Sequence, residues 1–322
     1  MQLSDLKKAM KGVVIVQTTP FNKDGSLDLE GMRANTRWLV ERTAGKDFIL
    51  TPTGSTGEFY AMSDDERKAV LKMVVEEVKG KNVVLAGAAQ AGTPETIKMC
   101  QYAESIGADG AMVVLPYYHI PEEEGMYQHY KQVAESVNIG IMIYNNPDVS
   151  GSWIKPALMA KLSKIPNIIA IKENTPYIMS YYAMQSAVDP NDAPILCGAG
   201  EQMFSFEALY GCPGFISDIA NYAPDVSYSV YEAAIARDFN KLTELVDSIA
   251  PIYSFIDKVT ANHGPHTGTG GALAGYMYIG VDKAVMDIVG LRGGEVRLPL
   301  VGLNEEEKAE LRSILRTMRL LK

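Results

Sequence analysis

The sequence predicts an α/β fold of the (β/α)8 barrel class (a TIM barrel), followed by a C-terminal helical extension. Eight short apolar runs recur over residues 1–235, separated by stretches of helical pattern. Their starts lie about 20 to 40 residues apart, a spacing that fits one strand, one loop and one helix per repeat. Eight such repeats favour a barrel, because a doubly wound sheet usually has fewer strands. We therefore expect a barrel over residues 1–235 and helices that pack on it over 236–322.

Each apolar run is bounded by loop signals and is interpreted as a strand. The predicted strands are Gly12–Val16, Phe48–Leu50, Val83–Ala86, Ala111–Leu115, Ile139–Tyr144, Ile168–Lys172, Ile195–Cys197 and Gly214–Ser217. Three helix starts lie between them. Ser63 and Glu66 have the spacing of a capping box, and Thr93 is placed at a helix cap with Pro94 at the first helical position. The acidic run 122–124 suits the positive end of a helix dipole.

The C-terminal region is predicted to be mostly helical. Apolar residues keep helical spacing over 242–252 and 311–321, and an apolar helix is expected around 281–289. Between them, 262–275 is rich in Gly, Thr and His, and the sequence assigns it no role. Because no Gly/Ser-rich or Pro-rich linker precedes the region, we expect it to pack on the barrel.

Composition excludes several classes of function. The net charge is −9, and no Lys/Arg-rich stretch with interleaved aromatics offers a footprint for nucleic acid. The longest apolar runs are too short to span a membrane, and Met1–Met10 contains no apolar segment of signal length. Cys100, Cys197 and Cys212 form no CxxC pair, which suits buried thiols in a reducing compartment. The sequence therefore predicts a soluble, cytoplasmic protein.

Lys172 is the most informative residue of the chain. It ends the run Ile168–Lys172 and is followed at once by polar residues. Burial at the end of such a strand favours the neutral amine, which is a nucleophile toward carbonyl carbon. The alternative is that the side chain leaves the sheet and reaches water. The residues at the other strand ends favour the first interpretation, since a barrel places its active site there.

The second predicted strand is followed by Gly54-Ser55-Thr56-Gly57-Glu58. Two hydroxyl groups between two glycines, with closely approachable backbone N–H groups, suit a carboxylate or phosphate. A glycine turn whose hydroxyls cap the next helix is an equally good interpretation of this segment alone.

Tyrosines end two further strands. Gly140, Met142 and Tyr144 share one strand face, and Ile168, Ala170 and Lys172 are expected to share another. If both faces point into the lumen, the Tyr144 phenol can relay protons beside Lys172. A core tyrosine with a satisfied hydroxyl is the alternative. Tyr117-Tyr118 suits a rim, a subunit interface or a proton relay, and the sequence does not choose among these.

Weaker candidates follow the last two strands. Glu201 closes the loop Cys197-Gly198-Ala199-Gly200-Glu201, where glycines could cradle a phosphate, but no Lys or Arg accompanies them. A substrate-facing loop is the better interpretation, and Asp218 is expected to line the same pocket. His263 and His266 have no further ligand nearby, so a metal site is not predicted.

Together these motifs resemble the dihydrodipicolinate synthase and N-acetylneuraminate lyase family of Schiff-base enzymes. The likeness runs from Gly12 to about Pro299 and is carried by four motifs at strand ends. They are Thr18-Thr19-Pro20-Phe21, Gly54-Ser55-Thr56-Gly57-Glu58, Tyr144-Asn145-Asn146-Pro147 and Ile171-Lys172-Glu173.

The resemblance implies specific roles for these residues. Lys172 forms an imine with pyruvate or another 2-oxo acid, and Ser55 and Thr56, beside Gly54, hold its carboxylate. Tyr144 transfers protons, and Tyr118 completes the relay across a subunit contact. Ile216 packs near the imine lysine. No metal or organic cofactor is required, and a homodimer or homotetramer is implied.

One departure affects the expected substrate. Synthases of the lysine pathway carry an arginine where this chain has Val149, and valine cannot replace a bidentate carboxylate clamp. The leading prediction is therefore a lyase, either aldolase or dehydratase, for a 2-keto-3-deoxy sugar acid, with Glu201 and Asp218 binding substrate hydroxyls. The alternatives are a synthase that condenses pyruvate with aspartate semialdehyde, and a non-catalytic barrel that senses a 2-oxo acid.

Overall fold

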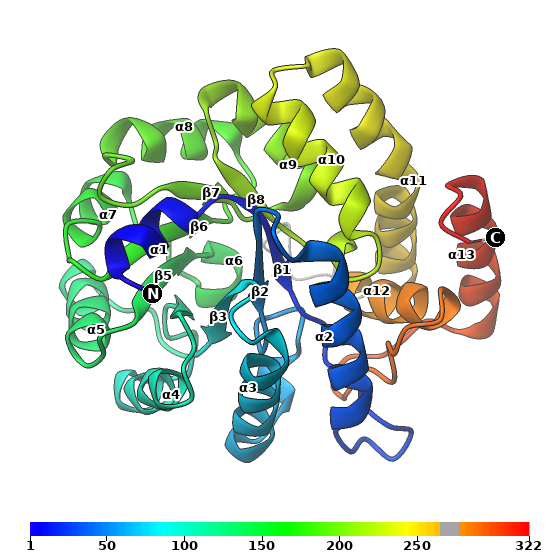
Figure 1. The fold of residues 1–322 in the computed structure, drawn as a ribbon, viewed down its shortest axis with the longest axis horizontal. Helices are drawn as coiled ribbons and strands as arrows, with labels where there is room; N and C mark the ends of the chain where they lie inside the picture. The colour runs from blue at the N-terminus through cyan, green and yellow to red at the C-terminus, as the bar shows by residue number, and fades with distance from the viewer. Residues whose placement is uncertain (265–276, 322) are drawn as a thin grey trace.

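A closed barrel of eight parallel strands forms the centre of the molecule (Figure 1). The computed structural model describes residues 1–264 and 277–321. Each strand pairs with the next, and β8 pairs with β1 to close the barrel. The strands are β1 (Gly12–Val16), β2 (Phe48–Thr51), β3 (Val83–Gly87), β4 (Gly110–Val114), β5 (Gly140–Asn145), β6 (Ile168–Glu173), β7 (Ile195–Cys197) and β8 (Gly214–Ser217). The predicted fold class is confirmed, and every predicted strand matches an observed one to within one residue at each end.

Helices cover the outside of the barrel between the strands (Figure 1). They are α2 (Leu29–Thr43), α3 (Asp64–Val78), α4 (Thr93–Ser105), α5 (Glu123–Glu135), α6 (Pro147–Ser150), α7 (Pro156–Leu162), α8 (Ile178–Ala187), α9 (Gly200–Glu207) and α10 (Pro224–Ile235). Short 3-10 turns lie at η1 (Phe59–Ala61), η2 (Ala208–Tyr210) and η3 (Ile219–Asn221). Helix α1 (Leu3–Ala9) precedes β1, and its Leu6 packs into the apolar cluster of the barrel interior.

Strand alternation divides the core into an interior cluster and a larger cluster under the helices. The alternation breaks in β6, where the register with β5 shifts between Ile141 and Met142. Ile168 packs under the helices, whereas Ile169 and Ala170 both lie in the interior cluster. The prediction that Ile168 shares a face with Lys172 was therefore wrong, because a register irregularity re-aims the side chains before it.

Two of the three predicted helix starts are confirmed. Ser63 and Glu66 form the reciprocal capping box of α3, and Glu123 and Glu124 lie in the first turn of α5. The prediction for Thr93 was wrong: Gly92 is the N-cap of α4 and Thr93 is its first residue. The Thr93 hydroxyl instead lies 2.9 Å from Nδ1 of His129 on α5. It is therefore engaged with another helix and does not cap α4.

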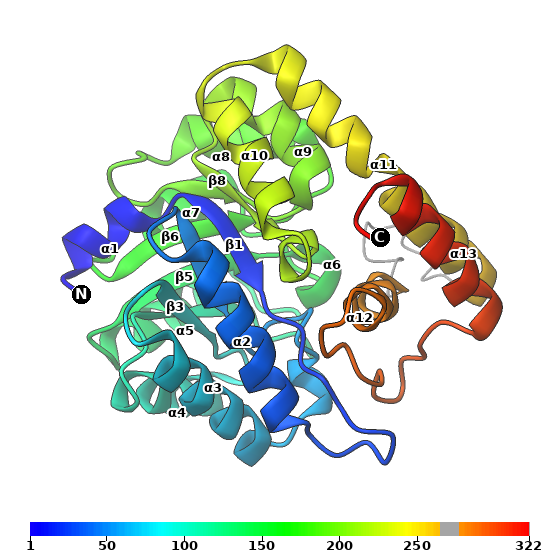
Figure 2. The same cartoon turned by 45° about the vertical axis from the view of Figure 1, so that its right-hand side comes forward.

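The C-terminal helices form a separate group on one side of the barrel (Figure 2). They are α11 (Phe239–His263), α12 (Met277–Ile288) and α13 (Glu305–Thr317). Their apolar faces meet in a third cluster that also contains Ile219 and Tyr222, which follow β8. The region thus packs directly above the end of β8. The predicted boundary at residue 235 coincides with the end of α10 and remains a prediction about domain organisation.

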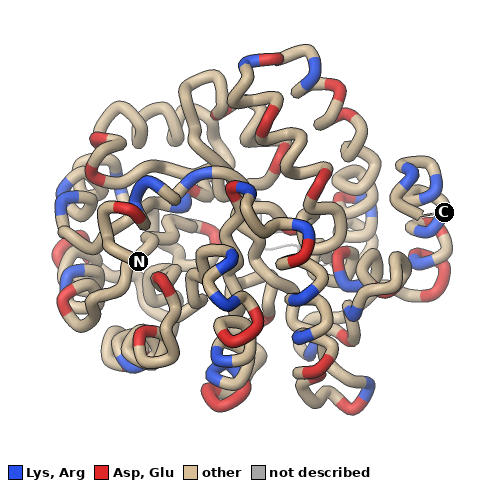
Figure 3. Tube along the Cα trace, in the orientation of Figure 1, with Lys and Arg blue, Asp and Glu red and all other residues tan. Residues whose placement is uncertain are grey.

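Charged residues of both signs are interspersed over the outer helices in the view of Figure 3. In the described ranges, no helix combines the length and apolar character that crossing a membrane requires.

Candidate active site

Lys172 and Tyr144 meet at the carboxyl ends of β6 and β5. The strand register pairs them directly, and Lys172 Nζ lies 3.7 Å from the centroid of the Tyr144 ring. The Lys172 residue is only 4% exposed. An amine held against the face of an aromatic ring, with little access to water, is well placed to attack a carbonyl carbon that enters the lumen.

The Tyr144 hydroxyl is oriented by its neighbour. Asn146 Nδ2 donates a hydrogen bond to it over 2.6 Å, which leaves the phenol's own proton to be donated elsewhere. The Asn146 side-chain oxygen in turn accepts from the backbone N–H groups of Asp148 and Val149 and so caps α6. Val149 is half-buried against the interior cluster.

The loop after β2 brings Ser55 and Thr56 to the same lumen. Its glycines are needed for close packing: a Cβ at Gly54 would lie 2.5 Å from Val16 Cγ1, and one at Gly57 would lie 2.8 Å from the Gln17 carbonyl oxygen. Thr53 and Glu58 flank them with φ of 57° and 54°, in the left-handed region that strains residues with a side chain. Tertiary contacts must therefore stabilise this strained conformation of the loop after β2.

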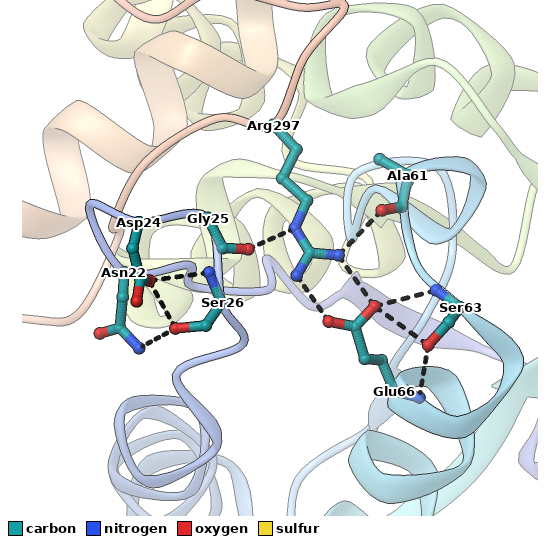
Figure 4. A network of polar contacts seen from close by, with 8 residues as sticks. All are labelled: Asn22, Asp24, Gly25, Ser26, Ala61, Ser63, Glu66 and Arg297. Carbon is teal, nitrogen blue, oxygen red and sulfur yellow. Dashed lines mark hydrogen bonds and ion pairs between the residues drawn. The ribbon is translucent and has the colours of Figure 1, made fainter.

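Those contacts come from the C-terminal region. The buried Glu58 carboxylate forms an ion pair with Lys283 of α12 and accepts a hydrogen bond from the Arg297 backbone N–H over 2.9 Å. The Arg297 side chain binds Glu66 and also donates to the carbonyl groups of Ala61 and Gly25 (Figure 4). The conformation of the Ser55-Thr56 segment thus depends on residues more than two hundred positions away in sequence.

A cavity of about 490 Å³ opens above Lys172. Strand ends and the loops that follow them supply Ser55, Thr56, Tyr144, Lys172, Asn174, Gly198, Ala199, Gly200, Glu201, Ile216, Asp218 and Ile219. The C-terminal helices supply Tyr253, Ile256, Asp257, Thr260, Ala261, Tyr278 and Asp282. Among these lining residues Lys172 is the single Lys or Arg, whereas four carboxyl groups line the cavity.

Two of these carboxyl groups, Asp218 and Asp282, face the same interior. Thr56 Oγ1 donates a hydrogen bond to Asp218 over 2.7 Å, so this hydroxyl already has an acceptor within the protein. Burial raises the pKa of Asp218, against the opposing effects of Thr56 and the Lys172 charge. Asp282 is 1% exposed, and burial, together with the charge of Asp218, raises the pKa of its carboxyl well above the ordinary value.

Glu201 is the third buried carboxyl group and is fully engaged. Ser217 and Ser227 each donate to one of its oxygens over 2.6 Å, and the Tyr253 phenol donates to the other over 2.7 Å. Burial, and then the charge of Glu201, raise the pKa of that phenol well above its usual range. Glu201 is therefore fixed at the junction of α9, β8 and α11.

The structure brings most of the predicted site residues together. Ser55, Thr56, Tyr144, Lys172, Glu201, Ile216 and Asp218 all line the cavity, and Gly54 lies beneath it in a small hollow shared with Ser55 and Tyr144. Tyr118 does not join them within one chain: it is 80% exposed, and its ring packs on His119. Its predicted role across a subunit contact remains a prediction.

Sequence reasoning missed the wall of the cavity, namely Asn174, Tyr253, Thr260, Tyr278 and Asp282. Asn174 follows Lys172 and Glu173 directly, so its position at a strand end could have identified it. The other four lie on α11 and α12, and no local pattern indicates which helix face meets the barrel.

The histidines of the C-terminal region lie elsewhere. His263 lines a second cavity, of about 380 Å³ between α11 and α13, and its Nε2 lies 2.9 Å from Glu307 Oε1. His266 lies outside the described residues. Within the described ranges, no group of three His, Cys, Asp or Glu side chains could hold a metal ion.

The fold and the site together define a class: a barrel lyase of the class I, Schiff-base-forming type. The family model described as the dihydrodipicolinate synthetase family matches residues 9–318, and the chain belongs to that family. The predicted resemblance is thereby confirmed.

Relatives found by sequence similarity agree with this assignment. The chain is 33% identical over 314 residues, 97% of its length and 100% of the relative, to a 4-hydroxy-tetrahydrodipicolinate synthase of Methanococcus maripaludis. It is also 33% identical over 312 residues, 97% of its length and 99% of the relative, to the enzyme of that name from Archaeoglobus fulgidus.

Solved structures of the same family share the fold. Dihydrodipicolinate synthase from Aquifex aeolicus superposes with a TM-score of 0.84 at 28% identity, covering 97% of this chain and 99% of that one. YagE, a prophage protein of the dihydrodipicolinic acid synthase family from E. coli K12 solved in complex with pyruvate, gives 0.84 at 29% identity, with the same coverage.

Proposed function

We propose that this protein forms an imine between Lys172 and a pyruvate-type 2-oxo acid and uses it to make or break a bond at the substrate's third or fourth carbon. The observation that carries the proposal is a buried amine 3.7 Å from the Tyr144 ring centroid, at the floor of a cavity bordered by Ser55 and Thr56.

The chemistry follows from these positions. The Lys172 amine adds to C2 of the 2-oxo acid, and loss of water from the carbinolamine gives an iminium ion. This cation draws electrons from the adjacent carbon, so it stabilises a carbanion at C3 and permits aldol addition or cleavage. Backbone N–H groups of the Ser55-Thr56 segment bind the carboxylate, and the Tyr144 phenol donates and accepts the proton of the oxygen that becomes hydroxyl or carbonyl.

The names of the relatives make condensation the first candidate reaction. Those compared above are called 4-hydroxy-tetrahydrodipicolinate synthase. The corresponding candidate here is the condensation of pyruvate with aspartate semialdehyde. This supports the synthase alternative better than the sugar-acid reading favoured by the sequence alone. The cavity of about 490 Å³ is large enough for both reactants.

A 2-keto-3-deoxy sugar acid is the second candidate, on one specific observation. The wall that would face the second reactant is lined by carboxyl groups and phenols, with no Lys or Arg beyond Lys172 among the described lining residues. Such a wall accepts hydrogen bonds from hydroxyl groups, whereas a second carboxylate is better held by arginine, which Val149 does not supply.

Two further parts of the proposal concern assembly and location. Tyr118 is exposed whereas Tyr144 is buried, which supports an oligomer in which Tyr118 reaches a neighbouring subunit. The three cysteines lie within the described ranges, are buried and form no disulfide, which supports a cytoplasmic location.

Borohydride trapping tests the proposal. We expect incubation with pyruvate followed by reduction to add one pyruvate-sized mass at Lys172 and to leave Lys172→Ala unmodified. Absence of the adduct with pyruvate and with a panel of 2-keto-3-deoxy acids would contradict the proposal. A condensation assay with aspartate semialdehyde and a cleavage assay with the sugar acids then separate the two candidates.

A further inference from the structure

Asn146 contacts the phenol that the proposed reaction uses. Asn146 is 1% exposed, and its Nδ2 atom lies 2.6 Å from the Tyr144 hydroxyl oxygen. Its backbone carbonyl oxygen accepts hydrogen bonds from the N–H group and from the hydroxyl of Ser150, over 3.0 and 2.9 Å. Because these contacts fix the backbone of Asn146, its hydrogen bond to Tyr144 is a fixed feature of the site.

The direction of this hydrogen bond follows from the other end of the amide. Asn146 Oδ1 accepts hydrogen bonds from the backbone N–H groups of Asp148 and Val149, over 3.1 and 3.2 Å. In a side-chain amide only the oxygen accepts hydrogen bonds, so the nitrogen must face Tyr144. Asn146 therefore donates to the phenol oxygen. The phenol's own proton is then free to point into the cavity that Tyr144 lines.

Capping of α6 does not by itself explain an amide at this position. A helix cap needs one side-chain oxygen, which serine and aspartate supply as well as asparagine does. Neither of these residues can present an amide N–H group to the phenol. The property that distinguishes asparagine here is therefore the donor that Tyr144 receives.

The preceding asparagine has a different set of contacts. Asn145 Nδ2 donates to Glu173 over 2.8 Å, and Asn145 Oδ1 accepts from the Ile154 backbone N–H over 3.0 Å. The strand register pairs Asn145 with Glu173, next to the pair of Tyr144 with Lys172. Asn145 thus joins β5 to β6 behind the site, whereas Asn146 contacts the phenol itself.

We propose that Asn146 is a positioning residue that directs the Tyr144 proton toward the substrate and stabilises the phenolate that remains. This inference rests on the imine proposed above and on the proton transfer assigned there to Tyr144. Once the proton has left, the Asn146 N–H group meets a negatively charged oxygen. A hydrogen bond to a charged acceptor is stronger than one to a neutral acceptor. The contact therefore strengthens as the proton moves, and an interaction that strengthens toward the transition state accelerates the reaction.

The step balances in both directions. In addition, the nitrogen lone pair of the enamine forms the iminium while C3 bonds to the carbonyl carbon of the second reactant. The π electrons of that carbonyl move to its oxygen, which takes the Tyr144 proton and becomes a hydroxyl. A phenolate remains, with Asn146 donating to it. In cleavage, the phenolate removes the hydroxyl proton, the carbonyl forms again, and the electrons of the broken C–C bond return to the iminium.

Two substitutions test the direction of the hydrogen bond. Asn146→Asp keeps the shape and the cap, but it replaces the N–H donor with a carboxylate oxygen that accepts the phenol's proton. Asn146→Ser keeps a cap oxygen and leaves the phenol without either contact. We expect Asn146→Ser to lower kcat by about 10²-fold, the scale of losing one donor to a developing oxyanion, and Asn146→Asp to lower it further. A role in capping alone predicts the reverse order, since aspartate retains more of the native geometry than serine.

The control is the same substitution at another helix cap. Asn304 caps α13 through its side-chain oxygen, so Asn304→Asp should retain the kcat of the unsubstituted protein. The assays are the condensation and cleavage reactions named above, measured across pH because a protonated carboxyl group still donates. The expected order should hold at the highest pH at which the unsubstituted protein is active, and Asn146→Asp should recover activity as pH falls. KM for the 2-oxo acid should not change, because the Ser55-Thr56 segment is proposed to hold its carboxylate.

The outcomes separate this inference from the proposed function. Pyruvate trapping at Lys172 should persist in each variant, which shows that its site is assembled. An unchanged kcat in Asn146→Ser overturns the role of Asn146 and leaves the imine intact. A higher kcat in Asn146→Asp than in Asn146→Ser at that highest pH does the same. If Asn146→Asp does not fold, Asn146→Ser decides by itself. Absence of an adduct in the unsubstituted protein overturns the imine, and an adduct without turnover in either assay overturns the proton transfer that Asn146 would serve.

Discussion

The floor and the wall of the cavity are built in different ways. The floor consists of Ser55, Thr56, Tyr144 and Lys172, each at or just after the carboxyl end of a strand. The wall consists of Tyr253, Thr260, Tyr278 and Asp282, all on α11 and α12. The barrel fixes the floor through backbone pairing between neighbouring strands, such as Tyr144 with Lys172. The wall is held by side-chain packing, by the ion pair of Lys283 with Glu58 and by the hydrogen bond from Tyr253 to Glu201.

This difference separates two properties of the enzyme. Strand ends hold the amine and the phenol that any imine-forming reaction in this barrel needs. The C-terminal helices supply the groups that the distal part of the substrate meets, and they also lock the loop after β2 through Lys283 and Glu58. Changes to the floor should therefore affect rate without affecting folding, whereas changes to the wall should affect stability, substrate choice and pH dependence.

The largest expected effect is on the floor. Tyr144→Phe should lower kcat by about 10²- to 10⁴-fold, because it removes the proton relay beside the imine. Trapping of pyruvate at Lys172 should persist, since the amine is untouched. Steady-state rates and intact mass measure the two effects. Tyr102→Phe, whose hydroxyl bonds the Lys68 carbonyl on the outer surface, is the control and should retain activity.

Breaking the ion pair between wall and loop should affect stability next most strongly. Lys283→Met leaves Glu58 buried without its cation, and loss of one partner of a buried pair costs about 3–5 kcal/mol. Urea denaturation measures the change in free energy of unfolding. Lys308→Ala breaks an exposed pair with Glu305 and should cost less than about 1 kcal/mol. Equal losses in the two variants would show that the C-terminal region does not anchor the loop.

A smaller effect is expected on the outer face of the strand that carries Lys172. Burial raises the pKa of Glu173 to about 7 from 4.5, despite hydrogen bonds from Asn145 and Thr175. Between these values the native state binds more protons than the unfolded state. The contribution of Glu173 to the free energy of unfolding is therefore fully present below pH 4.5. It is lost as pH rises toward 7, and the total loss is about 3 kcal/mol.

Glu173→Gln tests this assignment, because glutamine does not titrate. We expect the free energy of unfolding, measured by urea denaturation at several pH values, to depend less on pH than in the unsubstituted protein. Part of the slope should remain, since burial also raises the pKa of Glu207 to about 8. An unchanged slope in Glu173→Gln would assign the pH dependence to other groups.

The smallest effect is expected at the cap of α3. Ser63→Ala removes one half of the capping box and should cost about 1 kcal/mol. Its partner Glu66 also binds Arg297, whose guanidinium holds the pKa of that carboxyl at about 2 (Figure 4). Asn304→Ala, in the equivalent box of α13, is the matched comparison. Because Glu307, the partner of Asn304, also has a tertiary partner in His263, the two substitutions should cost similar amounts in urea denaturation, and a much larger loss in one of them would contradict this.

Much of the barrel could be predicted because short segments of the sequence specify each strand. Eight apolar runs, each followed by turn residues, define the strands, and strand order fixes which ends converge. Lys172, Tyr144 and Ser55 were therefore predictable as neighbours from position alone. Ile168 and Thr93 were not placed correctly, because a register irregularity and a side-chain partner on another helix decide them.

The sequence by itself determined the barrel and the strand-end floor that carries the lysine proposed to form the imine, because strand periodicity and loop position are properties of short segments. Only the tertiary structure decided that α11 and α12 cover the floor and that Asp282 lines the same cavity as Asp218. It also decided that Lys283 holds the loop carrying Ser55. Those contacts join residues far apart in the chain, and apolar periodicity shows that a helix has a buried face without showing which surface that face will meet.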